Sequence, residues 1–131
     1  MEIICFRGKG DTGKSTIIQR ILNEFFNITL IPKKKKDFCL IFPYKTKMIG
    51  ICSDGDKPSV LEKLEELKNE GCEILICASR TKGELFEGIY QMDKNVKPII
   101  CLGKKKSPKW FKVKENKKRI REFKRIFNAY F

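Results

Sequence analysis

The alternation of apolar and polar residues predicts strands and helices in turn along the first half of the chain. The apolar run "EIICFR" at 2–7 predicts a buried strand. Apolar residues at helical spacing predict an amphipathic helix over 14–26. Two further apolar segments, separated by "PYK", predict an antiparallel hairpin over about 38–52.

The second half continues the alternation. A capping box, Ser59 with Glu62 three residues on, begins a helix that ends at Gly71. The remaining elements are expected to be a strand at 72–79, a short helix at 83–92, a strand at 97–103 and a C-terminal amphipathic helix at about 114–130. This order predicts an α/β fold: a three-layer α/β/α sandwich whose mostly parallel sheet has about five strands and one antiparallel hairpin strand. The whole chain, 1–131, is expected to form a single domain.

The cysteines and the apolar runs indicate the cellular compartment in which the protein is expected. No apolar run approaches the ~20 residues of a membrane span, and no secretory leader is recognisable. Five of the six cysteines lie inside apolar runs, and none has C-x-x-C spacing. They are therefore interpreted as buried reduced thiols rather than as disulfides or zinc ligands, and the protein is predicted to be cytoplasmic.

Histidine content and charge narrow the chemistry. The chain has no histidine, which excludes every mechanism with an imidazole base and leaves phosphoryl transfer well suited to the residues present. The net charge of +13 favours anionic partners such as nucleotides, nucleic acid or an anionic surface. An AT-rich coding sequence would give the same lysine excess, so both explanations stay open.

The segment "GKGDTGKS" satisfies the pattern G-x-x-x-x-G-K-[ST] and lies between a predicted strand and a predicted helix. Its glycines let backbone N–H groups turn inward and surround phosphates. Lys14 is expected to reach the β- and γ-phosphates, and Ser15 to ligate magnesium. The residues predicted to bind the nucleotide are Gly8, Lys9, Gly10, Asp11, Thr12, Gly13, Lys14, Ser15 and Thr16.

With this loop, residues 1 to about 103 resemble the P-loop NTPases, in an element order similar to that of the small GTPases. The resemblance implies a magnesium-associated aspartate after the hairpin, where "GICSDGD" offers Asp54 or, second, Asp56. A solvated turn is the alternative for this stretch. The guanine-specific N-K-x-D motif is missing from "CLGKKKSPK", so ATP with Mg²⁺ is the expected ligand.

The loop also partly resembles a class with the pattern K-G-G-x-G-K-[ST]. In that class an extra lysine reaches into the partner's site across a homodimer. Lys9 stands at that position, although Asp11 replaces the second glycine. A lysine with no such role is the alternative.

Charged residues after later strands complete the candidate site. Arg80 and Lys82 follow a buried strand, where a cation stabilises a transferring phosphoryl group or holds a second substrate; a solvated basic loop is the alternative. Asp54, Asp56 and Glu84 are the acids near this edge, and the sequence does not choose a base among them. Lys14, Asp54 and Arg80 are the predicted catalytic residues.

Three functions fit these features. The first is a magnesium-dependent ATPase or nucleotide-dependent switch, the second a small nucleotide or nucleoside kinase, and the third a basic nucleic-acid-binding module. Lysines 33–36 and 104–106 fall in predicted loops. Three roles are open for them: gating of the nucleotide site, binding of nucleic acid, or exposure to solvent without a ligand. Trp110 and Phe111 stand among basic residues, where they stack on bases or, as we favour, fix the tail to the core.

Overall fold

The computed structural model describes most of the chain and has an α/β fold. The described residues are 1–9, 13–29, 38–53, 60–81, 83–102 and 107–131. Their elements are β1 (Glu2–Arg7), α1 (Lys14–Arg20), the π-helical turn η1 (Ile21–Phe25), β2 (Cys39–Tyr44), β3 (Lys47–Cys52), α2 (Val60–Asn69), β4 (Ile74–Ser79), α3 (Glu84–Met92), β5 (Lys97–Ile100) and α4 (Lys109–Asn128). None of these helices, taken over the described residues, combines the length and the apolar content needed to cross a bilayer.

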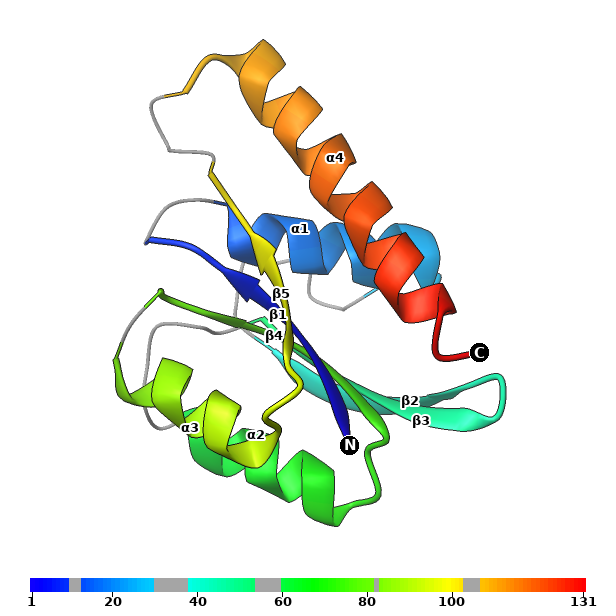
Figure 1. Cartoon of the computed structure of the whole chain (residues 1–131). Helices are drawn as coiled ribbons and strands as arrows, with labels where there is room; N and C mark the ends of the chain where they lie inside the picture. The colour runs from blue at the N-terminus through cyan, green and yellow to red at the C-terminus, as the bar shows by residue number, and fades with distance from the viewer. Residues whose placement is uncertain (10–12, 30–37, 54–59, 82, 103–106) are drawn as a thin grey trace.

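The described strands form one five-stranded sheet in the order β2-β3-β4-β1-β5. β1 lies between β4 and β5 and is parallel to both, with Cys5 opposite Cys77 on one side and Pro98 on the other. β3 is parallel to β4, and β2 is antiparallel to β3. The mostly parallel sheet with one antiparallel pair is therefore confirmed, and β4 separates β1 from the hairpin (Figure 1).

Alternate residues of the strands serve two hydrophobic clusters. In β1, Ile4 and Phe6 pack in a cluster with residues of α1, η1 and α4. Ile3 and Cys5 pack instead with residues of α2 and α3. Figure 1 shows the same division, with α1 and α4 on one side of the sheet and α2 and α3 on the other. The two-residue side-chain period of a strand explains this division.

The C-terminal helix begins earlier than the sequence pattern predicted. α4 starts at Lys109 rather than near residue 114, directly after Pro108. Proline has a fixed φ and no backbone N–H, so it suits the start of a helix. Pro108 was the residue in the sequence that indicated this earlier start. Because the helix starts at Lys109, Trp110 lies on the helix rather than in a loop.

The hairpin turn also lies later than predicted. β2 continues through Pro43 and Tyr44, and the chain reverses at Lys45, whose φ is 53°. Proline is tolerated here because β2 is an edge strand and Pro43 needs no ladder hydrogen bond on its open side.

Two cysteines are oxidised, which corrects the prediction of reduced thiols at these positions. Cys39 and Cys52 form a disulfide. They are directly opposed in the hairpin, next to the pair Phe38 and Ser53, which is joined by a backbone hydrogen bond. Cys39 and Cys52 are therefore a pair without ladder hydrogen bonds, the arrangement in which opposed side chains approach most closely.

The other four cysteines are free and buried, as predicted: Cys5, Cys72, Cys77 and Cys101. Because two of the six are paired in a disulfide, the cysteines together no longer indicate a reducing compartment.

Two glycines explain how α2 and α3 end and pack. Gly71 follows α2 with φ 94°, and the next N–H, of Cys72, donates to the Leu67 carbonyl at 3.1 Å, the hydrogen bond of a Schellman cap. Gly88 lies inside α3, where an added Cβ would be 2.5 Å from Cδ2 of Leu61 on α2. Glycine at this position permits the two helices to approach closely.

Candidate nucleotide site

The predicted phosphate loop joins the end of β1 to the start of α1. The Gly8 N–H donates to the carbonyl of Ser79 at 3.2 Å, which ties the beginning of the loop to the end of β4. Gly13 has φ 84° and ψ 16°, a left-handed conformation, and its carbonyl accepts the first helical hydrogen bond, from Ile17 N–H at 3.0 Å. Gly10, Asp11 and Thr12 lie outside the described residues.

Lys14 is the first residue of α1 and folds back onto the loop. Its side chain is buried, and its Nζ donates to the carbonyls of Gly8 at 2.8 Å and Lys9 at 3.0 Å. The side chain of Lys9 is exposed, as is Thr16 on the first turn of α1. The ammonium group of Lys14 is therefore held against the backbone of the predicted loop.

Ser15 connects the start of α1 with the end of the hairpin. Its Oγ donates to the carbonyl of Ser53 at 3.2 Å. Ser53 is buried, and its own Oγ accepts a hydrogen bond from Phe38 N–H at 2.9 Å. Asp54, the predicted magnesium ligand, follows directly in the sequence but lies outside the described residues. The serine predicted to bind magnesium thus contacts the residue that precedes the predicted acid.

The strand order places Arg80 next to the loop. Arg80 follows β4, the neighbour of β1, and the preceding residue, Ser79, is opposite Arg7. Arg80 is exposed, and so is Glu84, the first residue of α3. Asp56 and Lys82 lie outside the described residues, as do lysines 33–36 and 104–106.

Sequence reasoning missed the role of Arg7, the residue directly before the loop. Its Nη1 donates to the hydroxyl of Tyr90 at 2.8 Å. Its guanidinium carbon also lies 4.5 Å from the ring centre of Phe86 and 5.5 Å from that of Tyr90. Arg7 therefore joins the end of β1 to α3. The period of β1 indicated this direction, because Arg7 shares a face with Ile3 and Cys5.

Burial keeps two of the free thiols neutral. It raises the pKa of Cys101 to about 12 and that of Cys72 to about 11. Both side chains are therefore protonated at pH 7, so neither supplies the thiolate required for nucleophilic attack.

Comparison with known proteins gives no assignment: no protein family, curated protein or solved structure matches the chain. The resemblance to P-loop NTPases thus remains a prediction from the motif. Function has to be argued from the geometry around the loop.

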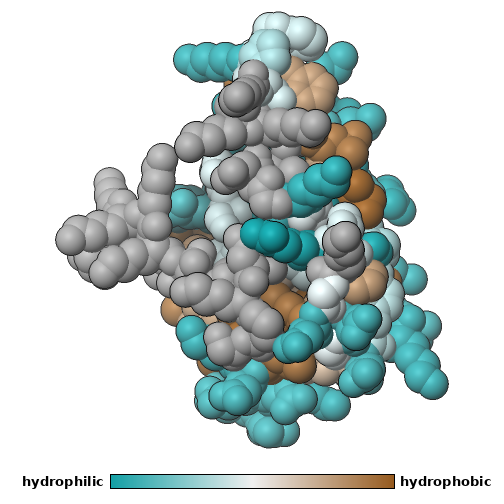
Figure 2. Space-filling model, turned by 90° about the vertical axis from the view of Figure 1, so that its left-hand side faces the viewer, coloured by the Kyte–Doolittle hydropathy of each residue, from teal (hydrophilic) through white to brown (hydrophobic). Residues whose placement is uncertain are grey.

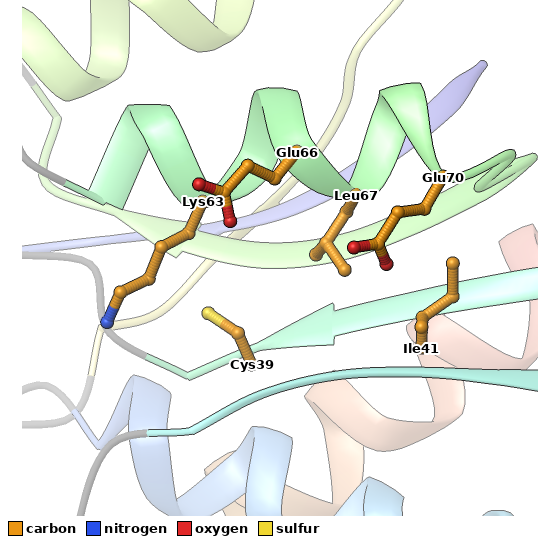
Figure 3. Close-up of a pocket in the computed structure, with 6 residues that line it drawn as sticks. All are labelled: Cys39, Ile41, Lys63, Glu66, Leu67 and Glu70. Carbon is orange, nitrogen blue, oxygen red and sulfur yellow. The ribbon is translucent and has the colours of Figure 1, made fainter.

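A hollow elsewhere on the molecule does not suit phosphates. It has a volume of about 360 Å³ and is formed by α2 and the edge strand β2 (Figure 3). Its lining residues are Cys39, Ile41, Lys63, Glu66, Leu67 and Glu70. Two carboxylates against one ammonium group would repel a polyphosphate.

The loop lies instead at the carboxyl ends of the strands. Figure 2 looks onto this side, where β1 ends and α1 begins, and hydrophilic side chains lie along its top, right and bottom edges. The carboxyl ends of the strands are also where open α/β sheets bind their ligands.

Proposed function

We propose that this protein is a P-loop NTPase that binds ATP with Mg²⁺ and hydrolyses it. The observation that carries the proposal is the position of the Lys14 ammonium group, buried against the carbonyls of Gly8 and Lys9. It is combined with a left-handed Gly13 at the start of α1. A cation held beneath a glycine-rich turn at the beginning of a helix suits a polyphosphate.

The donors present fit both parts of the ligand. Lys14 would contact the β- and γ-phosphates, together with backbone N–H groups at the start of α1. The Ser15 hydroxyl, placed beside Ser53, would hold the metal ion together with Asp54. Bound magnesium supplies positive charge at the phosphate oxygens.

Residues that follow the loop in the sequence would act on the γ-phosphoryl group as it is transferred to water. Arg80, directly after the strand adjacent to β1, would stabilise charge on the γ-phosphoryl group. Glu84 and Asp54 are the acids available to orient a water molecule. The absence of N-K-x-D supports adenine over guanine. The proposal includes the three-layer α/β/α arrangement, because helices from both sides contribute to the two hydrophobic clusters.

The test is calorimetry of ATP and GTP binding in the presence of magnesium, with Lys14→Ala beside the wild type. Loss of hydrogen bonds to a charged group costs about 1.5–3 kcal/mol, so ATP should bind about 10- to 150-fold more weakly to the variant. Lys94→Ala, which removes an exposed lysine after α3, is the matched control and should bind as the wild type does. Circular dichroism checks that both variants fold.

Three outcomes would overturn the proposal. They are failure of the wild type to bind ATP, tighter binding of GTP than of ATP, and an equal loss of ATP affinity in Lys14→Ala and Lys94→Ala. Phosphate release then tests hydrolysis: Arg80→Ala should reduce turnover by about 10³-fold or more while leaving ATP affinity within a few fold of wild type. ATP binding without any phosphate release would restrict the function to binding.

A further inference from the structure

The positive charge of the chain is concentrated on α4. This helix carries nine basic and two acidic residues, a net charge of +7 in a chain of +13. α2, on the other side of the sheet, has three acidic and two basic residues, a net charge of −1. A compositional lysine excess would be shared by all exposed helices, so composition does not explain this difference.

The two acids of α4 are used within the helix. Glu115 and Arg119 are both buried, and Arg119 Nε lies 3.2 Å from Glu115 Oε1. The Nη1 of the same arginine lies 3.1 Å from Glu122 Oε2. Both carboxylates therefore face Arg119, and the positive charge of the exposed side of α4 is not offset by its own acids.

Five of the exposed residues of α4 form a row. Trp110, Lys114, Lys117, Arg121 and Lys124 are all exposed and follow the spacing i, i+4, i+7, i+11, i+14. This spacing places them on one face of the helix. With a rise of about 1.5 Å per residue, the row is about 21 Å long and its members are about 5–6 Å apart.

Trp110 stands at the end of this row and is 69% exposed. The sequence predicted a contact with the core for the pair Trp110 and Phe111; this is wrong for Trp110, whereas Phe111 is partly buried. A single exposed aromatic side chain is common on protein surfaces. Among cations, however, an exposed indole also offers a face on which a base can stack.

We propose that this row, defined as the five residues from Trp110 to Lys124, binds a single-stranded nucleic acid. The cations contact successive phosphates, and an unpaired base stacks on the indole of Trp110. The proposal does not depend on ATP binding, because none of the five residues belongs to the predicted phosphate loop.

The apolar side of α4 argues against an anionic membrane as the partner. Phe123 and Phe127 are fully buried and belong to the same cluster as Phe6 of β1. A helix that lies in a membrane interface needs a free apolar face, and here that face is packed on the sheet. Charge complementarity with a base available for stacking therefore favours nucleic acid.

The experiment is fluorescence titration with a 20-nucleotide oligothymidylate, without ATP or magnesium. Because Trp110 is the single tryptophan of the chain, quenching of the intrinsic emission reports on this residue alone. Trp110→Ala, followed by anisotropy of a labelled oligonucleotide, should bind about 5- to 140-fold more weakly with little change in salt dependence. Lys14→Ala should bind the oligonucleotide as the wild type does, which separates this test from that of the proposed function.

Salt dependence tests the cations. Four phosphate contacts predict a slope of log K against log salt of about −3, and the double variant Lys117→Gln and Arg121→Gln should reduce it to about −1.5. The charge-matched control removes two exposed lysines from α2, with Lys63→Gln and Lys68→Gln, and should keep the wild-type slope.

Three results would overturn the proposal. They are unchanged tryptophan emission when the oligonucleotide saturates the protein, an equally reduced salt slope in the α2 control variant, and binding of a DNA duplex as tight as that of the single strand. Binding to vesicles that contain phosphatidylserine, without binding to the oligonucleotide, would assign the surface to membranes instead. Thermal unfolding by circular dichroism confirms that the variants keep the fold; those on α4 and α2 are all at exposed positions.

Discussion

Two glycines with the same backbone conformation allow the phosphate loop to be tested against a matched position. Gly13, in the loop, has φ 84°, and Gly71, after α2, has φ 94°. At each position an added Cβ would have no heavy atom within 4 Å. Alanine therefore introduces backbone strain at both sites without a steric clash.

The expected cost is conformational. An L-residue in the left-handed region costs about 1–2 kcal/mol, so each Gly→Ala variant should lose about that much free energy of unfolding. With roughly 2.1 cal/mol/K of unfolding entropy per residue over 131 residues, the melting temperature should fall by about 4–7 °C in both. Urea denaturation followed by circular dichroism measures the free energy, and the slope against urea should stay unchanged.

The two variants should differ in nucleotide binding. Where the free Gly13→Ala variant avoids the strain by leaving the left-handed conformation, it is less destabilised, and ATP has to restore that conformation; binding should then weaken by up to about 5- to 30-fold, which corresponds to the part of the 1–2 kcal/mol not lost from stability. Gly71→Ala should leave ATP affinity unchanged. The reasoning is refuted if Gly13→Ala loses neither stability nor ATP affinity while Gly71→Ala is destabilised, or if both variants lose affinity equally.

Three further substitutions test packing, the metal site and the hairpin. Gly88→Ala should lower the free energy of unfolding by at most about 2 kcal/mol. The new methyl group would lie 2.5 Å from a Leu61 methyl group, which costs about 1–3 kcal/mol, and the higher helix propensity of alanine offsets about 1 kcal/mol of this cost. In a double-mutant cycle, Leu61→Ala should relieve this cost. If the free-energy changes of the two single variants simply add in the double variant, the clash between residues 61 and 88 is contradicted. Ser15→Ala should change the free energy of unfolding, measured by urea denaturation, by at most about 1.5 kcal/mol. It should also abolish the dependence of ATP affinity on magnesium, measured by calorimetry. If ATP affinity still depends on magnesium in this variant, the Ser15 hydroxyl is excluded as a metal ligand. Replacing Cys39 and Cys52 by serine should cost about 3 kcal/mol in non-reducing denaturation experiments, because the disulfide closes a short loop, and reductant should narrow the difference. An equal difference with and without reductant would contradict this explanation.

Local pattern was sufficient for most elements. The termination of α2 just before Gly71 followed from glycine chemistry, and the helix that begins at Lys14 followed from apolar periodicity. The candidate loop was predictable for the same reason, because its residues are contiguous and each has a local role. Hydrophobic alternation also predicted one antiparallel hairpin in a parallel sheet.

Long-range pairing was not predictable in this way. Nothing in the sequence of β4 states that it lies between β1 and β3, since all three strands are similar apolar runs. The Cys39–Cys52 disulfide depends on the register of the hairpin, which is set by a turn two residues later than the pattern indicated. The contact between Ser15 and Ser53 likewise depends on how α1 crosses the sheet.

The central position of β1 has a consequence for synthesis on the ribosome. β1 is made before both of its partners in the sheet, β4 and β5, and Glu2 pairs with Ile74. At about 5–20 residues per second, roughly 4–14 s pass between the synthesis of these two residues. During that time the apolar strand has no edge to join, so the nascent chain has to shield it with α1 or a chaperone. The residues of the predicted nucleotide loop are thus synthesised before the strands that support them, and they acquire their supporting sheet only about 70 residues later.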